Sequence, residues 1–296
     1  MPAYYRARFR VVVGWVSFLT FTITVMLLEV LGCGDAFCGR RYNTSFLLRE
    51  PDLLLIDGPQ ALFRLLAERD IDRDSLTQMV LTHVHGDHVS GFETLMLWNR
   101  FALKRRLRLI TSAAVFEDVK EGFFSRVRKS FSSDLTGFRQ RSLEDYIEWV
   151  EVSEREPVVL EGGTTIEIRH NWHPVATLGL RLSTEDGSIS ISGDTCFRPR
   201  LLEELLKLGV LDKERHRRLA GDWLWNADVV YHEASRGEQH SLHTLESDLL
   251  ALPAEIRERL RLVHLADDYR SGSIPLAVEG ERVWLKAEEL PRIIGT

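Results

Sequence analysis

Residues 82–91, Thr-His-Val-His-Gly-Asp-His-Val-Ser-Gly, concentrate side chains that can bind metal ions. His83, His85, Asp87 and His88 place three imidazoles and one carboxylate within six positions. Neutral imidazole and carboxylate are the ligands that borderline divalent cations such as zinc prefer. A single histidine usually belongs to the surface or to packing, but four ligands this close together, with a glycine between them, are hard to assign to packing. The segment therefore predicts a metal site.

The elements around this motif determine where its side chains point. Met79–Thr82 predicts a short strand, and Val89–Ala102 predicts a helix. Because side chains alternate along an extended chain, His83 and His85 should point to one side of the strand end. A turn should then present the other two ligands to a neighbouring position. Two ligand pairs so close together predict two metals side by side.

A site for two metals needs more ligands than this motif supplies. Three further candidates lie where predicted strands end, namely His173 in Asn-Trp-His-Pro, Asp194 in Ser-Gly-Asp-Thr and His264 before Leu-Ala-Asp-Asp. Side chains at the ends of different strands can converge at one edge of a sheet. Because a carboxylate has two oxygens, Asp194 is the natural bridge between two metals.

Short apolar strands alternate with amphipathic helices along the chain, which predicts a layered α/β architecture. We expect strands at Thr22–Leu31, Thr44–Leu48, Leu53–Asp57, Met79–Thr82, Leu109–Thr111, Thr164–His170, Gly179–Ser183, Ser188–Ser192, Val229–His232 and Arg261–His264. We expect helices at Gln60–Arg69, Val89–Ala102, Ala113–Phe124, Pro199–Leu208, Thr244–Leu252 and Glu255–Leu260. Val119–Glu148 and Lys207–Asp222 have the composition of insertions.

The composition is that of an ordinary globular protein, with 296 residues, 44% hydrophobic and 28% charged. Three cysteines without a CxxC pair favour a reducing compartment, so we expect a cytoplasmic protein. Residues 11–28 carry no charge, which leaves membrane anchoring as an alternative. We favour a first core strand at 22–31, with residues 1–21 as a hydrophobic extension and 22–296 as one catalytic domain.

The net charge of −6 gives no overall attraction to nucleic acid, and we expect no stable DNA binding. Segment 100–141 is an exception, since it holds eleven Lys and Arg residues against four acids. Such a basic patch could attract phosphates, or it could be an exposed helix face.

The order His-x-His-x-Asp-His, a distant His, Gly-Asp-Thr and a terminal His resembles the metallo-β-lactamase superfamily, and within it the ribonuclease Z-like phosphodiesterases. Leu31-Gly32-Cys33-Gly34-Asp35 and His232-Glu233-Ala234-Ser235 resemble further motifs of that group, and the similarity runs from Thr22 to Tyr269. The resemblance implies a four-layer αβ/βα sandwich, with two mixed β-sheets flanked by helices and the metals at the edge between the sheets.

The resemblance also implies two divalent metal ions and the residues that bind them. Zinc is the expected metal, and manganese and iron are the alternatives. The ligands of the first metal would be His83, His85 and His173; those of the second would be Asp87, His88 and His264, with Asp194 between the two.

The same group has a histidine soon after its His-Glu-Ala-Thr motif that acts on the leaving group. His240 and His243 compete for this role, and His243, 21 residues before His264, suits the spacing better. Glu233 is expected either to fix a ligand or His243 or to be a buried packing residue, and His232 is a further supporting candidate.

The function implied is a dinuclear metal-dependent hydrolase. A hydroxide between the metals, oriented by Asp87, would attack a cyclic nucleotide, another small phosphodiester or an RNA 3′ end. No glycine-proline-rich tip occurs between His85 and His173, which argues against transfer-RNA processing. The alternatives are a hydrolase of esters, lactones or β-lactams, or a metal-binding protein without turnover. A homodimer is expected by resemblance only.

Overall fold

The computed structural model describes residues 25–122, 124–131, 136–220, 222–236, 242–270, 272–286 and 291–295. The proposed extension at 1–21 and His240 lie outside the described residues. Among the described helices, none combines the length and the apolar character that a membrane crossing requires.

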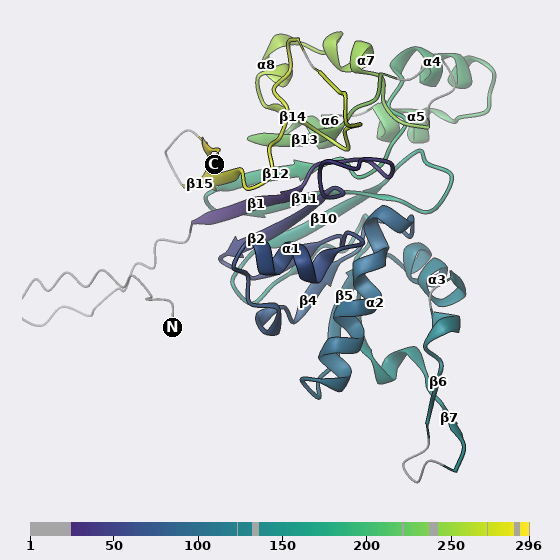
Figure 1. Cartoon of the computed structure of the whole chain (residues 1–296). Coiled ribbons are helices and arrows are strands. Elements are labelled where there is room, and N and C mark those ends of the chain that lie inside the picture. The colour runs from purple at the N-terminus through teal and green to yellow at the C-terminus, as the bar shows by residue number, and fades with distance from the viewer. Residues whose placement is uncertain are drawn as a thin grey trace, which may run out of the picture.

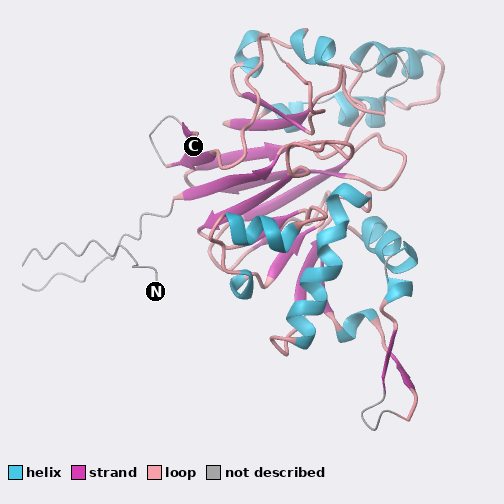
Figure 2. Cartoon of the chain, viewed as in Figure 1, coloured by secondary structure: helices cyan, strands magenta, loops and turns pink. Residues whose placement is uncertain are grey.

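Two mixed sheets face each other, with helices on both outer sides (Figures 1 and 2). The first sheet runs β16-β15-β1-β2-β3-β4-β5-β8 and the second runs β14-β13-β12-β11-β10-β9. The first sheet consists of β1 (Met26–Gly32), β2 (Ser45–Glu50), β3 (Leu54–Ile56), β4 (Gln78–Val80), β5 (Leu107–Thr111), β8 (Ile147–Glu151), β15 (Arg282–Leu285) and β16 (Arg292–Ile294). The second consists of β9 (Val158–Val159), β10 (Thr165–His170), β11 (Leu178–Thr184), β12 (Gly187–Ile191), β13 (Val229–Glu233) and β14 (Leu260–Val263).

The helices divide between the two outer faces, so that the sheets lie between two helical layers (Figure 1). The helices on the first sheet are α1 (Leu62–Glu68), α2 (Gly86–Phe101) and α3 (Ala113–Gly122). Those on the second are α4 (Pro199–Lys207), α5 (Lys213–Ala220), α6 (Asp222–Trp225), α7 (Glu246–Leu250) and α8 (Ala254–Arg257). This arrangement confirms the predicted αβ/βα sandwich.

The core between the sheets forms because their inner strands are apolar on the faces that meet. All seven residues of β1 are buried, as expected for a strand covered on both sides. Phe46 of β2 and Tyr231 of β13 bring their ring centroids to 5.0 Å across the two sheets. The Tyr231 hydroxyl donates a hydrogen bond of 2.8 Å to Glu281, which satisfies a polar group in this apolar layer.

The predicted strands all occur within a few residues of the expected bounds among the described residues, but other elements were not predicted. Strands β8, β15 and β16 extend the first sheet on both edges. The expected insertion at 119–148 contains a two-stranded hairpin, β6 (Lys129–Phe131) and β7 (Phe138–Gln140), which projects away from the sheets (Figure 1). The expected insertion at 207–222 contains α5.

One local prediction was wrong. Helix α2 begins at Gly86 rather than at 89, so Asp87 and His88 lie in its first turn and not in a preceding turn. His85 occupies the extended N-cap position, and its carbonyl accepts hydrogen bonds of 3.0 Å from the backbone N–H groups of His88 and Val89. An acidic side chain in the first turn also suits the positive end of the helix dipole.

Candidate metal centre

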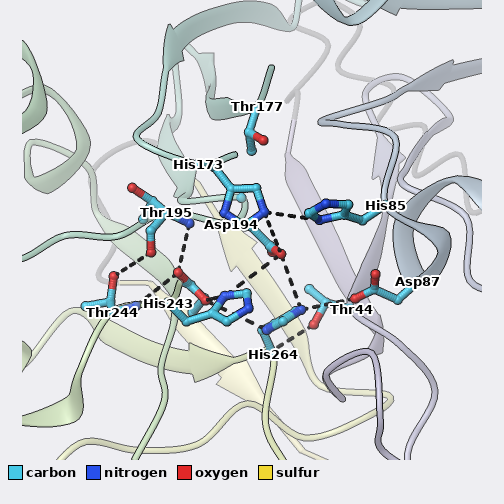
Figure 3. A network of polar contacts seen from close by, with 12 residues as sticks. Thr44, His85, Asp87, His173, Thr177, Asp194, Thr195, His243, Thr244 and His264 are labelled. Carbon is cyan, nitrogen blue, oxygen red and sulfur yellow. Dashed lines mark hydrogen bonds and ion pairs between the residues drawn. The ribbon is translucent and has the colours of Figure 1, made fainter. Parts of the chain in front are cut away.

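Loops at the ends of four strands converge at one edge of the sandwich. The motif at 83–88 follows β4, His173 follows β10, Asp194 follows β12 and His264 follows β14. Figure 3 shows His85, His173 and His264, which come from separate segments, around the Asp194 carboxylate. The structure brings together all seven residues that the sequence predicted as ligands.

The first group comprises His83, His85, His173 and Asp194, with one ligand atom of each lying within 4.8 Å of all the others. His173 Nε2 lies 3.1 Å from His85 Nδ1. Asp194 Oδ2 lies 3.5 Å from His83 Nε2 and 3.8 Å from His173 Nε2. Three imidazole nitrogens and one carboxylate oxygen make a four-ligand set of the kind that zinc accepts.

The second group comprises Asp87, His88 and His264, which meet the same 4.8 Å criterion. Asp87 Oδ2 lies 3.1 Å from His264 Nε2 and 3.3 Å from His88 Nε2. Asp194 faces this group too, because its Oδ1 lies 3.3 Å from His88 Nε2 and its Oδ2 lies 3.5 Å from His264 Nε2. Asp194 is thus positioned between the two groups.

Unusual backbone conformations aim two of these ligands. Gly193, directly before Asp194, has a φ of +59°, and a Cβ there would lie 2.2 Å from the carbonyl oxygen of Leu178. His264 also has a φ of +59°, which is uncommon for a residue with a side chain. Its backbone N–H donates to the Thr44 hydroxyl at 3.0 Å. Such strain is typical of functional sites, where the surrounding structure holds it in place.

The polar atoms of the site fit a divalent cation. Nε2 of His83 and Nε2 of His88 are buried without a hydrogen-bond partner among the described residues, although buried polar atoms are normally satisfied. Both nitrogens face the Asp194 carboxylate, so a cation between them would supply the missing partner. The fold and the donor set therefore imply divalent metal ions at this edge.

The carboxylates and imidazoles of the site shift one another's pKa values. Burial lowers the pKa of His173 to about 3, which keeps that imidazole neutral. Burial alone would raise the pKa of Asp194, but the charges on His264 and His88 outweigh it and hold this pKa well below its usual range. For His264 burial is again outweighed, and Asp194 raises its pKa to about 9. The carboxylates thus favour positive charge at this point.

Asp57 supports the site and was not predicted as a functional residue. Its Oδ2 lies 2.8 Å from His88 Nδ1 and accepts a hydrogen bond of 2.7 Å from the Thr82 hydroxyl. Its Oδ1 accepts a hydrogen bond from the Thr82 backbone N–H at 2.8 Å. A carboxylate on the outer nitrogen of a ligand histidine fixes the ring orientation and tautomer. The available signal was an acidic residue at the end of an apolar strand, Leu54-Leu55-Ile56-Asp57.

Glu233 and His243 form a pair beside the two ligand groups. His243 Nδ1 lies 2.5 Å from Glu233 Oε2 and 4.0 Å from Asp194 Oδ2. Glu233 Oε1 accepts hydrogen bonds from the backbone N–H groups of Thr195 and Thr244 at 2.8 and 3.2 Å. Of the two roles considered for Glu233, these contacts favour support of His243 over simple packing.

His232 lies apart from the described clusters of potential ligands. Its Nδ1 is 2.6 Å from the Glu233 carbonyl oxygen, and its ring stacks on Trp225 with centroids 5.2 Å apart. These contacts indicate a packing role for His232 behind the centre.

Two facing mixed sheets with a His/Asp centre at their edge define the class, which is that of proteins with the metallo-β-lactamase fold. The metallo-β-lactamase fold protein YhfI from Bacillus subtilis superimposes with a TM-score of 0.63 at 16% identity, covering 88% of this chain and 99% of that one. The predicted fold is confirmed.

Within this class, the chain belongs to the family of the anti-Pycsar protein Apyc1, whose model matches residues 26–281. The Apyc1 of Paenibacillus sp. (strain J14) is 29% identical over 250 residues, which cover 82% of this chain and 91% of that protein. The cAMP/cGMP-dependent 3′,5′-cAMP/cGMP phosphodiesterase B of Dictyostelium discoideum is 28% identical over 211 residues. This match covers 71% of this chain but spans only 18% of the length of the Dictyostelium enzyme.

Proposed function

We propose that this protein is a dinuclear phosphodiesterase that hydrolyses small phosphodiesters, with 3′,5′-cyclic nucleotides as its substrates. The observation that carries the proposal is the position of Asp194, whose two oxygens lie between 3.3 and 3.8 Å from imidazole nitrogens of both ligand groups. A bridging carboxylate suits a pair of adjacent metals. The names of the cyclic nucleotide phosphodiesterases among its relatives favour this substrate class.

Each side chain then has a defined task. The first metal would be held by His83, His85 and His173, the second by Asp87, His88 and His264, and both by Asp194. We propose zinc for both ions, with manganese or iron as alternatives. When bound, two such ions neutralise charge on the phosphoryl oxygens and make water more acidic.

His243 is proposed as the group that protonates the departing alkoxide, a poor leaving group without a proton. Burial lowers the pKa of His243, but the Glu233 carboxylate outweighs this and raises it above the ordinary value. Because Nδ1 faces Glu233, Nε2 is the atom that would give its proton to the leaving oxygen. Asp87, in contact with two ligand histidines of the second group, would orient the attacking water.

The test uses the purified full chain, with bound metal measured by elemental analysis. The substrates are bis(p-nitrophenyl) phosphate, a panel of 3′,5′-cyclic nucleotides, a short RNA, a lactone and a chromogenic β-lactam. We expect two metals per chain and metal-dependent opening of the cyclic nucleotides. His173→Ala should lose metal and activity, whereas His216→Ala, which removes a histidine paired with Glu203 on another part of the chain, should keep both. Turnover of the lactone or β-lactam alone would refute the proposal.

A further inference from the structure

A cavity of about 350 Å³ opens beside the metal centre. Its walls come from the loop after β1, the segment after β13 and the segment after β14. His243 and His264 line it and also belong to the centre. A ligand in this cavity is therefore next to the metals, and its volume falls in the range of small-molecule sites.

We propose that this cavity binds the nucleobase of the cyclic nucleotide, with Phe37 stacking on the base; the inference rests on the proposed function. In a 3′,5′-cyclic nucleotide the phosphate and the base are attached to the same ribose. When the phosphate lies at the metals, the base must lie in a neighbouring space. Of the described residues that line the cavity, His264 lies on the side of the metal centre and Phe37 lies at the outer rim.

Phe37 has an unusual position for a large apolar residue, since the residue is 95% exposed. Its backbone is nevertheless fixed, because its N–H donates to Asp35 Oδ1 at 2.9 Å. The residues that follow Phe37 are also held, because Asp267 accepts hydrogen bonds from the Cys38 thiol and from the backbone N–H of Arg40, at 2.8 and 2.9 Å. A ring on an anchored loop at the rim of a cavity can stack on a planar ligand at a small entropic cost.

The inner wall offers further contacts that suit a heterocycle. Tyr269 is buried, and the guanidinium of Arg236 lies 5.1 Å from the centre of its ring. Arg236 is held by Glu246 at 3.2 Å, so its position is also defined. Asp35 and Asp268 line the same cavity, and a carboxylate can accept the N–H groups at the edge of a base. Aromatic faces with hydrogen-bonding groups around them are the features that recognise nucleobases.

The experiment compares two substrates on the metal-loaded full chain. Bis(p-nitrophenyl) phosphate has no nucleobase, whereas 3′,5′-cAMP has one, so the ratio of their kcat/KM values isolates the base contact. We expect Phe37→Ala to lower the cAMP to bis(p-nitrophenyl) phosphate ratio by about 5- to 150-fold, which corresponds to the loss of one base–aromatic stack. Phe37→Trp should keep the ratio. The matched control is Phe138→Ala, an exposed aromatic on the projecting hairpin, which should leave both substrates unaffected.

An unchanged ratio in Phe37→Ala would overturn the inference. The inference would also be overturned if Phe37→Ala lowered kcat/KM equally on both substrates and changed the oligomeric state seen by sedimentation. Phe37 would then be a contact between subunits. These outcomes differ from a failure of the proposed function, in which the unmodified chain would hydrolyse neither substrate.

Discussion

Nδ1 of His243 lies 2.5 Å from Oε2 of Glu233, a carboxylate whose other oxygen accepts two backbone N–H groups. Glu233 is buried, so its orientation is fixed by these three contacts rather than by solvent. The carboxylate therefore sets both the ring orientation and the proton affinity of His243. The pair is linked to the metal centre, because His264 Nδ1 lies 3.8 Å from the same Glu233 oxygen.

His243→Ala should lower kcat for a cyclic nucleotide by about 10²- to 10⁴-fold, because the alkoxide would leave without a proton. The loss should be much smaller for bis(p-nitrophenyl) phosphate, since p-nitrophenolate is a stable anion that needs no proton. Metal content, measured by elemental analysis, should stay the same. Loss of metal in this variant would show that His243 is a ligand, and equal losses on both substrates would contradict a proton donor.

Asp57→Asn should weaken metal binding by about 10- to 100-fold, because the His88 ring loses the carboxylate that orients it. The affinity can be measured by titrating the metal-free chain in a buffered metal solution. Asp52→Asn is the matched control, since Asp52 is similarly buried but accepts backbone N–H groups of Gly162 and Thr164. That variant should lose stability without a comparable loss of metal affinity; equal metal loss in both would show a general effect of unfolding.

The ligand motif was predictable because its residues are close together in the sequence and because strand ends meet at a sheet edge. His173, Asp194 and His264 follow β10, β12 and β14 at this edge, as the apolar runs before them indicated. Strands β15 and β16 were not predicted, because β15 pairs with β1, more than 250 positions away in the sequence, and β16 pairs with β15. Such partners have no local signal.

The supporting residues were harder to predict for a related reason. Asp57 is one carboxylate among many in the sequence, and only folding places it against His88, 31 residues away. The start of α2 at Gly86 was missed because histidine at an N-cap is not a strong capping signal. The cavity lined by Phe37 and Tyr269 joins segments more than 200 residues apart, and no spacing rule connects them.

Gly193→Ala should lower metal binding as well as stability, because a Cβ at this position would displace the neighbouring Asp194. At a φ of +59° an alanine costs roughly 1–2 kcal/mol, and here its Cβ would also lie 2.2 Å from the Leu178 carbonyl oxygen. The resulting shift would move Asp194, so we expect lower metal content as well as a lower melting temperature. Gly209→Ala is the control, because Gly209 has a φ of +71° with open space around it. Retention of full metal content in Gly193→Ala would contradict this view of the turn.

Glu281 makes the stability of the fold depend on pH at a point away from the ligands. Burial raises the pKa of Glu281 above its ordinary value of 4.5, and the hydrogen bond from the Tyr231 hydroxyl only partly opposes this. A carboxyl whose pKa is raised on folding stabilises the folded state fully at a pH below 4.5. This contribution is lost as the pH rises through the folded pKa, because the unfolded chain ionises more readily.

Glu281→Gln removes this titration while keeping an acceptor for Tyr231. We therefore expect the difference in unfolding free energy, wild type minus variant, to fall as the pH rises from 5 to 8. Urea unfolding of the metal-loaded protein at several pH values measures it, and any pH effect of metal binding is common to both proteins and cancels. The exposed Glu185→Gln should show no such trend. A difference that stays constant or rises with pH would mean that Glu281 does not carry a raised pKa in the folded protein.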